Sequence, residues 1–155
     1  MNRAMREEYE RWICGLGFTQ YLVLTLSNEA LERYSLGNAD SVARLVEATL
    51  GVSGHKGQWV ATLEKHTNRD VYHVNLLTEP SPRLERFVRL WRARYGWVNW
   101  NQHADAGAVR YVLKEIITDD DMASHFRFQL RRAPGRRTRR RGRRGRGGRP
   151  RVAHT

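Results

Sequence analysis

The sequence lacks several features that would assign it to common classes of protein. Its 155 residues include one cysteine, Cys14, which excludes an internal disulfide and a zinc site built from cysteines. No apolar run reaches the about 18 residues that a membrane helix needs, and residues 1–13 lack the apolar core of a secretion signal. A glycine-rich phosphate loop followed by Lys-Ser/Thr is also missing, so no ATPase or helicase motif is visible. We therefore expect a cytoplasmic protein.

Acidic residues are missing from the last part of the chain. Residues 127–155 contain 13 arginines and no Asp, Glu or Lys. Removing these 13 from the 28 Lys and Arg leaves 15 against 16 Asp and Glu, so residues 1–126 carry about −1 although the whole chain carries +12. Because the last segment has almost nothing apolar to bury, we predict one folded domain at 1–126 and a disordered basic tail at 127–155.

The tail is a candidate for nonspecific binding to nucleic-acid phosphates, and its other interpretation is a localisation or solubility segment. Its most closely spaced arginines are Arg136, Arg137, Arg139, Arg140, Arg141, Arg143 and Arg144.

Before the tail, short apolar segments alternate with segments that have a helical pattern. Strands are predicted at residues 18–26, 59–64, 71–78 and 97–101. Helices are predicted at residues 4–13, from Asn38 or Asp40 to 50 with Gly51 as the stop, after Pro82, and from Asp105 to 118. The order predicts an α+β fold, with a split β-α-β-β-α-β unit, as in an RNA-recognition motif, and one extra helix. We expect an antiparallel sheet with helices packed on one face.

The second and third strands carry the most informative pattern. With a turn at residues 67–70, Glu64 lies opposite His73 and Thr62 opposite Asn75. Alternation then places Thr62, Glu64, His66, His73 and Asn75 on one face. The apolar neighbours fall on the core face: Ala61, Leu63, Tyr72, Val74 and Leu76. Opposite side chains on adjacent strands lie within about 5 Å, so these polar groups can share a divalent cation such as Mg²⁺ or Mn²⁺. The alternative is an ordinary solvated sheet face.

The last predicted helix presents a tyrosine away from its apolar face. That face consists of Val109, Leu113, Ile116 and Ile117, with Ala106 beside them. At about 100° per residue, Tyr111 lies nearly opposite this face, and Lys114 is one turn away. A phenol can act as a nucleophile when a metal polarises the electrophile and a cation stabilises the developing charge. The alternative is an exposed tyrosine on an ion-paired surface helix.

Three segments together resemble the HUH endonuclease superfamily, in particular its rolling-circle replication initiators. Residues 21–25 (YLVLT) are similar to the first motif, a hydrophobic strand that ends in Thr. Residues 64–77 (EKHTNRDVYHVNLL) are similar to the metal motif, in which an upstream Glu and a His-hydrophobic-His pair hold the cation. Residues 110–114 (RYVLK) are similar to the third motif, Tyr-x-x-Lys on a helix. The resemblance spans residues 18–118.

The resemblance implies roles for individual residues. Glu64 and His73 would be ligands of Mn²⁺ or Mg²⁺, Tyr111 the nucleophile and Lys114 its electrostatic partner. Asn75 stands where the family has its second His, and its amide oxygen would bind a hard cation more weakly. His66 would compensate from the same face.

Glu115 stands where two-tyrosine members have their second Tyr, so the chain resembles the single-tyrosine type. The implied activity is nicking and joining of single-stranded DNA at a replication origin, including one extruded as a hairpin. The intermediate would be a 5′-phosphotyrosine with a free 3′-OH. The implied setting is a plasmid or phage of a bacterial or archaeal host, with the host helicase and polymerase as partners and no membrane.

Three other interpretations remain open at this point. One is a single-tyrosine transposase of the same superfamily. The second is a catalytically degenerate single-stranded nucleic-acid-binding module with a fold like an RNA-recognition motif, in which exposed sheet aromatics stack on bases. The third is a packaging or nucleoid protein in which the tail does the binding. The hairpin face presents Glu and His instead of paired aromatics, which speaks against the second, and the third would need no Glu64–His73–Tyr111 constellation. Fold-level analogy alone does not separate these interpretations.

Overall fold

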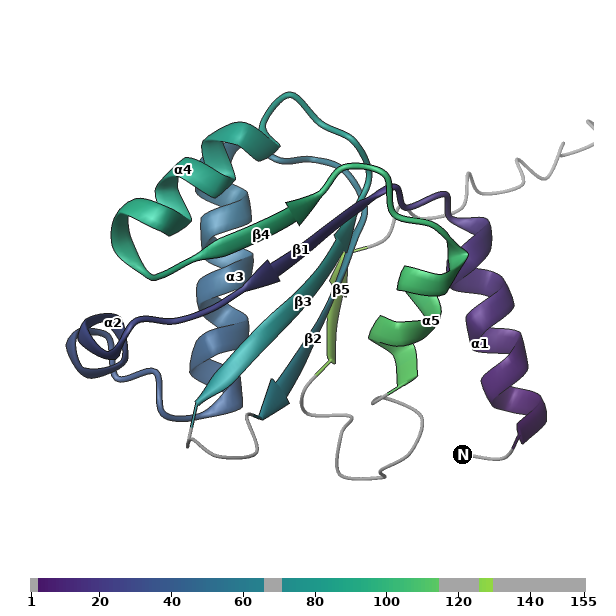
Figure 1. Cartoon of the computed structure of the whole chain (residues 1–155), viewed down its shortest axis with the longest axis horizontal. Coiled ribbons are helices and arrows are strands. Elements are labelled where there is room, and N and C mark those ends of the chain that lie inside the picture. Colours follow the sequence, from purple (N-terminus) through teal and green to yellow (C-terminus); the bar gives the residue numbers. More distant parts are fainter. Residues whose placement is uncertain (1–2, 66–70, 115–125, 130–155) are drawn as a thin grey trace, which may run out of the picture.

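The structure, a computed structural model, describes residues 3–65, 71–114 and 126–129. Helices and strands are interspersed along these residues (Figure 1). In chain order the elements are α1 (Arg3–Gly15), β1 (Gln20–Leu24), α2 (Asn28–Arg33), α3 (Ala39–Ser53), β2 (Trp59–Lys65), β3 (Tyr72–Thr78), α4 (Leu84–Arg94), β4 (Val98–Asn101), α5 (Ala106–Lys114) and β5 (Phe126–Gln129). The α+β class expected from the sequence is confirmed. Within the described ranges, no helix has both the length and the apolar character to cross a membrane.

The strands form one sheet in the order β4-β1-β3-β2-β5. Every neighbouring pair is antiparallel, as predicted. The pairing of β2 with β3 places Glu64 opposite His73 and Thr62 opposite Asn75, so the predicted register of this hairpin is confirmed. The two polar pairs therefore lie side by side on one face of two central strands.

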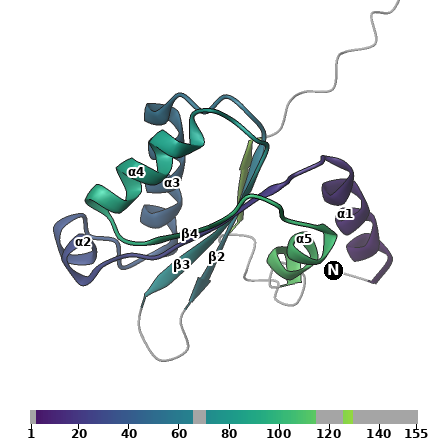
Figure 2. The same ribbon diagram turned by 45° about the horizontal axis from the view of Figure 1, so that its top comes forward.

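The helices cover both faces of the sheet, so the prediction of helices on one face is only partly right. Helices α3 and α4 pack on one face, and α1 and α5 lie on the other (Figure 2). The side chains confirm this division: Leu63 and Leu76 belong to the large apolar cluster with Val46 of α3 and Phe87 of α4. The second, smaller cluster joins Val60 and Leu77 to the two other helices.

This smaller cluster determines where α5 lies on the sheet. Ile13 of α1 and Val109 and Val112 of α5 pack against Val60 of β2 and Leu77 of β3. The apolar contact occupies the end of the hairpin at which β2 begins and β3 ends. Glu64 and His73 lie towards the opposite end of the same two strands. The polar part of the face therefore begins where the apolar contact with α5 ends.

Several element boundaries differ from the sequence-based expectation. Gly51 does not stop α3; the helix continues to Ser53, and Gly54, with φ of 81°, forms the left-handed C-cap. Asn38, rather than Asp40, is the N-cap, because its side chain accepts a hydrogen bond from the backbone N–H of Ser41. Helix α2 was not predicted; Ser27 caps it by accepting from the N–H of Ala30.

The fifth strand was also not predicted. Strand β5 (Phe126–Gln129) pairs with β2 from Trp59 to Thr62 and begins at the last residue of the predicted domain. Three of its four residues belong to the segment predicted as the basic tail. The sheet therefore extends past residue 126, and the rest of the predicted tail, residues 130–155, lies outside the described residues.

Candidate functional site

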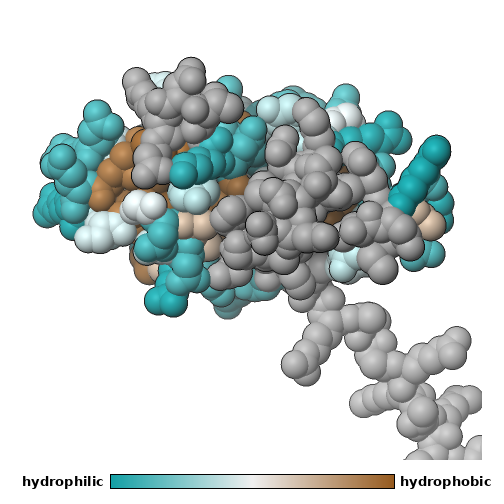
Figure 3. Space-filling model, turned by 90° about the horizontal axis from the view of Figure 1, so that it is seen from below, coloured by the Kyte–Doolittle hydropathy of each residue, from teal (hydrophilic) through white to brown (hydrophobic). Residues whose placement is uncertain are grey.

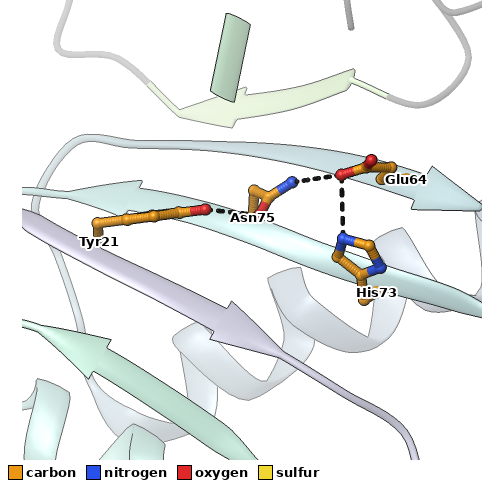
Figure 4. Close-up of polar contacts among 4 residues, drawn as sticks. All are labelled: Tyr21, Glu64, His73 and Asn75. Carbon is orange, nitrogen blue, oxygen red and sulfur yellow. Dashed lines mark hydrogen bonds and ion pairs between the residues drawn. The ribbon is translucent and has the colours of Figure 1, made fainter. Parts of the chain in front are cut away.

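A connected row of polar side chains lies on the α5 face of the sheet (Figure 4). His73 Nε2 lies 3.0 Å from Glu64 Oε2, and the side-chain nitrogen of Asn75 donates to the same carboxylate oxygen at 3.3 Å. The Tyr21 hydroxyl donates to Asn75 Oδ1 at 2.9 Å. The sequence had placed Glu64, His73 and Asn75 on one face, and the structure brings them into direct contact.

Asn75, in the middle of the row, is more buried than the residues on either side of it. Glu64 and His73 keep 29% and 27% of their side chains exposed, so solvent or a ligand can reach both. Asn75 is only 2% exposed, and both ends of its carboxamide have hydrogen-bond partners. A buried amide with both ends satisfied has a defined orientation, because leaving either end unpaired costs about 1–3 kcal/mol. The exposed pair is thus backed by a fixed amide.

Tyr21 is the site residue that the sequence did not reveal. It was noted only within a hydrophobic strand motif, whereas the pairing of β1 with β3 brings its hydroxyl to Asn75. Burial, the charge of Tyr111 and the charge of Glu64 together raise the pKa of Tyr21 from 10.0 to about 12. The phenol therefore stays protonated at neutral pH, as a hydrogen-bond donor and a poor nucleophile.

Tyr111 has a different environment. Val109 and Val112 bury one face of α5, while the Tyr111 side chain is 54% exposed. Asp105 fixes the start of this helix by accepting from the backbone N–H of Ala108 at 3.0 Å. Val109 and Val112 of α5 pack in the same cluster as Tyr21, so α5 carries Tyr111 on the polar-row side of the sheet. The predicted exposure of Tyr111 is confirmed, although Val112, not foreseen as apolar contact, shares the buried face with Val109.

The remaining predicted site residues lie wholly or partly outside the described residues. Lys114 is the last residue of α5, and its side chain is not described. His66 falls in the gap between β2 and β3. The tail arginines also lie outside the description: Arg136, Arg137, Arg139, Arg140, Arg141, Arg143 and Arg144.

The donor set can be tested against the metal that the sequence suggested. Among the described residues, no three His, Cys, Asp or Glu side chains gather as a metal site, so the third donor beside Glu64 and His73 would be Asn75. Two ligands that each lie about 2.1 Å from a cation at right angles are about 3.0 Å apart. His73 Nε2 and Glu64 Oε2 have this separation.

Asn75 needs one rearrangement to take part. Its Oδ1 accepts from Tyr21, and its nitrogen points to Glu64. A half-turn of the carboxamide exchanges the two atoms, and Tyr21 can then accept from the nitrogen, because a phenol hydroxyl is both donor and acceptor. Glu64, His73 and Asn75 therefore fit a hard divalent cation after a single amide rotation.

Comparison with known protein families, with characterised proteins and with solved structures finds no match for this chain.

Proposed function

We propose that the protein nicks and rejoins single-stranded DNA through a covalent 5′-phosphotyrosine, with a divalent cation as cofactor. The observation that carries this proposal is the row Glu64–His73–Asn75 on one sheet face, with the exposed Tyr111 on a helix that packs against the same face. A carboxylate, an imidazole and a free phenol are the groups that a metal-assisted phosphodiester transfer to tyrosine requires.

The arrangement of the strands supports the resemblance to the HUH replication initiators. The four strands β4-β1-β3-β2 and the helices α3 and α4 are arranged as in the split β-α-β-β-α-β unit of RNA-recognition motifs. The opposite face of the sheet then carries the polar row, with α5 as the proposed catalytic helix beside it. This placement supports the proposed roles of α5 and of the polar row.

The cation would be held by Glu64, His73 and Asn75. When bound, Mn²⁺ or Mg²⁺ supplies Lewis-acid polarisation of the scissile phosphate. Tyr21 positions the Asn75 carboxamide and stays neutral because its pKa is about 12. A neutral phenol beside the ligands adds no negative charge that would compete with the incoming phosphodiester.

Tyr111 is the attacking group. Its oxygen forms the new bond to phosphorus while the bond from phosphorus to the 3′-oxygen breaks. In net terms the phenol loses its proton and the leaving 3′-oxygen gains one, which gives the 3′-OH. The reverse reaction rejoins the strand. Lys114 is expected to stabilise the developing charge, and the free 3′-OH would be a primer for a host polymerase after a host helicase opens the duplex.

The experiment that tests the proposal is a search for the covalent adduct. The full chain is incubated with labelled single-stranded oligonucleotides, in Mn²⁺ or in EDTA, and separated on denaturing gels. We expect a metal-dependent adduct in the native protein and a loss of about a thousandfold or more in Tyr111→Phe. Tyr9→Phe is the matched control, because Tyr9 is 43% exposed on the neighbouring helix α1 and has no place in the polar row.

An adduct of unchanged yield in Tyr111→Phe would exclude Tyr111 as the nucleophile. The absence of any adduct, together with tight binding of the same oligonucleotides, would support a second function, a single-stranded nucleic-acid-binding module without catalysis. One observation favours that alternative: Asn75 Oδ1, the atom that would bind the cation, accepts a hydrogen bond from Tyr21.

A further inference from the structure

Three shallow depressions adjoin one another along α4, at the edge of the sheet where β4 is the outermost strand (Figure 1). The first, of about 460 Å³, lies between the start of α4 and Trp100. The second, of about 300 Å³, lies between Trp100 and Arg89. The third, of about 250 Å³, lies at the end of α4 beside Arg94. Trp100 lines the first two and Arg92 the last two, so the three form one continuous surface, here called the α4 track.

The lining of the α4 track has a net positive charge. Its basic residues are Arg89, Arg92 and Arg94 of α4 and Arg33 of α2. Its acidic residues are Glu85 of α4 and Glu29 of α2. Residues 1–126 as a whole carry about −1, by the composition given above, so this local excess is not a property of the whole domain. Seen from below, hydrophilic residues surround a hydrophobic patch at the left end of the molecule (Figure 3).

Two tryptophans accompany these arginines. Trp97 is 66% exposed, and the Arg92 guanidinium lies 5.1 Å from the centre of its ring. Arg92 is itself fixed, because it donates to the carbonyl oxygen of Val98 at 3.0 Å. Trp100 is partly exposed, and its indole N–H donates to the side chain of Gln20 at 2.9 Å. Exposed aromatic rings held beside arginines form a surface suited to stacking on bases.

The backbone also holds Trp97 in place. Its N–H donates to the Thr25 hydroxyl at 3.2 Å, and its carbonyl accepts from the Thr25 N–H at 2.9 Å. These two backbone hydrogen bonds fix the position of Trp97 in the turn between α4 and β4, from which its indole extends into solvent. With 66% of its surface exposed and Arg92 beside its ring, Trp97 is positioned to stack on a base.

We propose that the α4 track binds one strand of nucleic acid, with its phosphates on the arginines and a base stacked on Trp97. Such a strand offers phosphates that can pair with the arginines and an unpaired base that can stack on the indole of Trp97. The site differs from the metal row: Trp100 is paired with Leu22, whose side chain lies in the cluster of α3 and α4, on the face opposite Tyr21. The proposal does not depend on nicking, since binding along α4 requires neither Tyr111 nor a cation.

The test measures binding without catalysis. A fluorescent oligothymidylate of about 12 nucleotides is titrated with the full chain in EDTA, and affinity is followed by anisotropy over a range of salt concentrations. We expect Trp97→Ala to weaken binding about tenfold, because one stacked base is lost, and Trp97→Phe to keep most of the affinity. Arg89→Glu should weaken binding and reduce the salt slope by about 0.7 or more.

Arg44→Glu is the matched control, because Arg44 is an exposed arginine of α3, pairs with Asp40 and lines none of the three depressions. It makes the same change in net charge as Arg89→Glu and should change affinity less than twofold. Equal losses in these two variants, or an unchanged affinity in Trp97→Ala, would overturn the proposal. So would equally tight binding of duplex DNA or equal displacement by polyglutamate, since neither offers a base to stack.

A second readout locates the strand directly. Photo-crosslinking with bromodeoxyuridine oligonucleotides should label the peptide that contains Trp97, and crosslinks found only elsewhere would contradict the proposal. Both readouts are obtained in EDTA. A failure to form the Tyr111 adduct therefore leaves this result intact, and a failure here leaves the nicking experiment intact.

Discussion

The two faces of the β2–β3 hairpin consist of alternate residues of the same strands, yet one face is buried in the apolar core and the other carries polar side chains. On the α3 and α4 face, Leu63, Val74 and Leu76 are completely buried in the large apolar cluster. On the α5 face, Glu64 and His73 remain more than a quarter exposed and contact each other. Because successive side chains of a strand point to opposite faces, neighbours in sequence belong to separate environments. Stability and chemistry should therefore be separable by substitutions one residue apart.

The largest expected effect is a difference in the free energy of unfolding between variants of Leu63 and of its neighbour Glu64. Leu63→Ala should lower the free energy of unfolding by about 2–5 kcal/mol, because it removes buried methyl groups and leaves a cavity. The neighbouring Glu64→Gln should change it by less than about 1 kcal/mol, since the side chain is partly exposed and keeps its size. Denaturant unfolding of the metal-free proteins measures both.

The same pair should behave in the opposite way towards metal. Glu64→Gln removes the only carboxylate of the donor set and should lower Mn²⁺ affinity at least tenfold, measured by calorimetric titration. Leu63→Ala, examined where it is still folded, should bind Mn²⁺ like the native protein. A Glu64→Gln protein that is as unstable as Leu63→Ala would show that the polar face also holds the fold together.

The next effect sharpens the comparison within the polar face. Tyr21→Phe removes the hydroxyl that would accept from the Asn75 nitrogen once the carboxamide has turned Oδ1 towards the cation. It should lower Mn²⁺ affinity about tenfold, because that buried nitrogen would then have no partner. Tyr9→Phe again serves as the control. An unchanged Mn²⁺ affinity would mean that Asn75 does not need Tyr21 in order to bind the cation.

Tyr21→Phe also has a signature in the pH dependence. The pKa of Tyr21 is raised from 10.0 to about 12 in the folded protein, so the unfolded chain loses this proton first. The resulting contribution to stability is complete below about pH 10 and is lost as the pH rises towards 12. The native protein should therefore show one late phenol titration by ultraviolet absorbance, and Tyr21→Phe should lack it.

How far the sequence predicts this molecule depends on the range of the interactions. The register of Glu64 and His73 follows from strict alternation on both sides of a short turn, so it could be deduced from local pattern. The hydroxyl of Tyr21 lies 54 residues from Asn75 in sequence, and their contact depends on which strands become neighbours in the sheet. Alternation indicates the face of a strand, but not the partner across it.

The short elements were not predicted for a related reason. Helix α2 has six residues and a Ser27 cap, too few to show a helical apolar period. Strand β5 has four residues at the start of an arginine-rich segment, where the composition concealed a strand that pairs with β2. Gly51 was expected to end α3, but a single glycine costs only about 1 kcal/mol in a helix, and packing of the helix overrides it.

The smallest expected effect concerns a residue that, like Asn75, is buried although it lies on the polar face. Thr62 lies on the polar face, yet it is 3% exposed and its hydroxyl has no hydrogen-bond partner among the described residues. Thr62→Val keeps the shape and removes an unsatisfied polar atom, so it should raise the free energy of unfolding by about 1 kcal/mol in the absence of metal. Mn²⁺ affinity should stay within twofold, because the ligand row ends at Asn75. If the variant instead binds Mn²⁺ much more weakly, the buried hydroxyl belongs to the site, and the polar row extends one residue deeper along β2 than the contacts of Glu64 and Asn75 indicate.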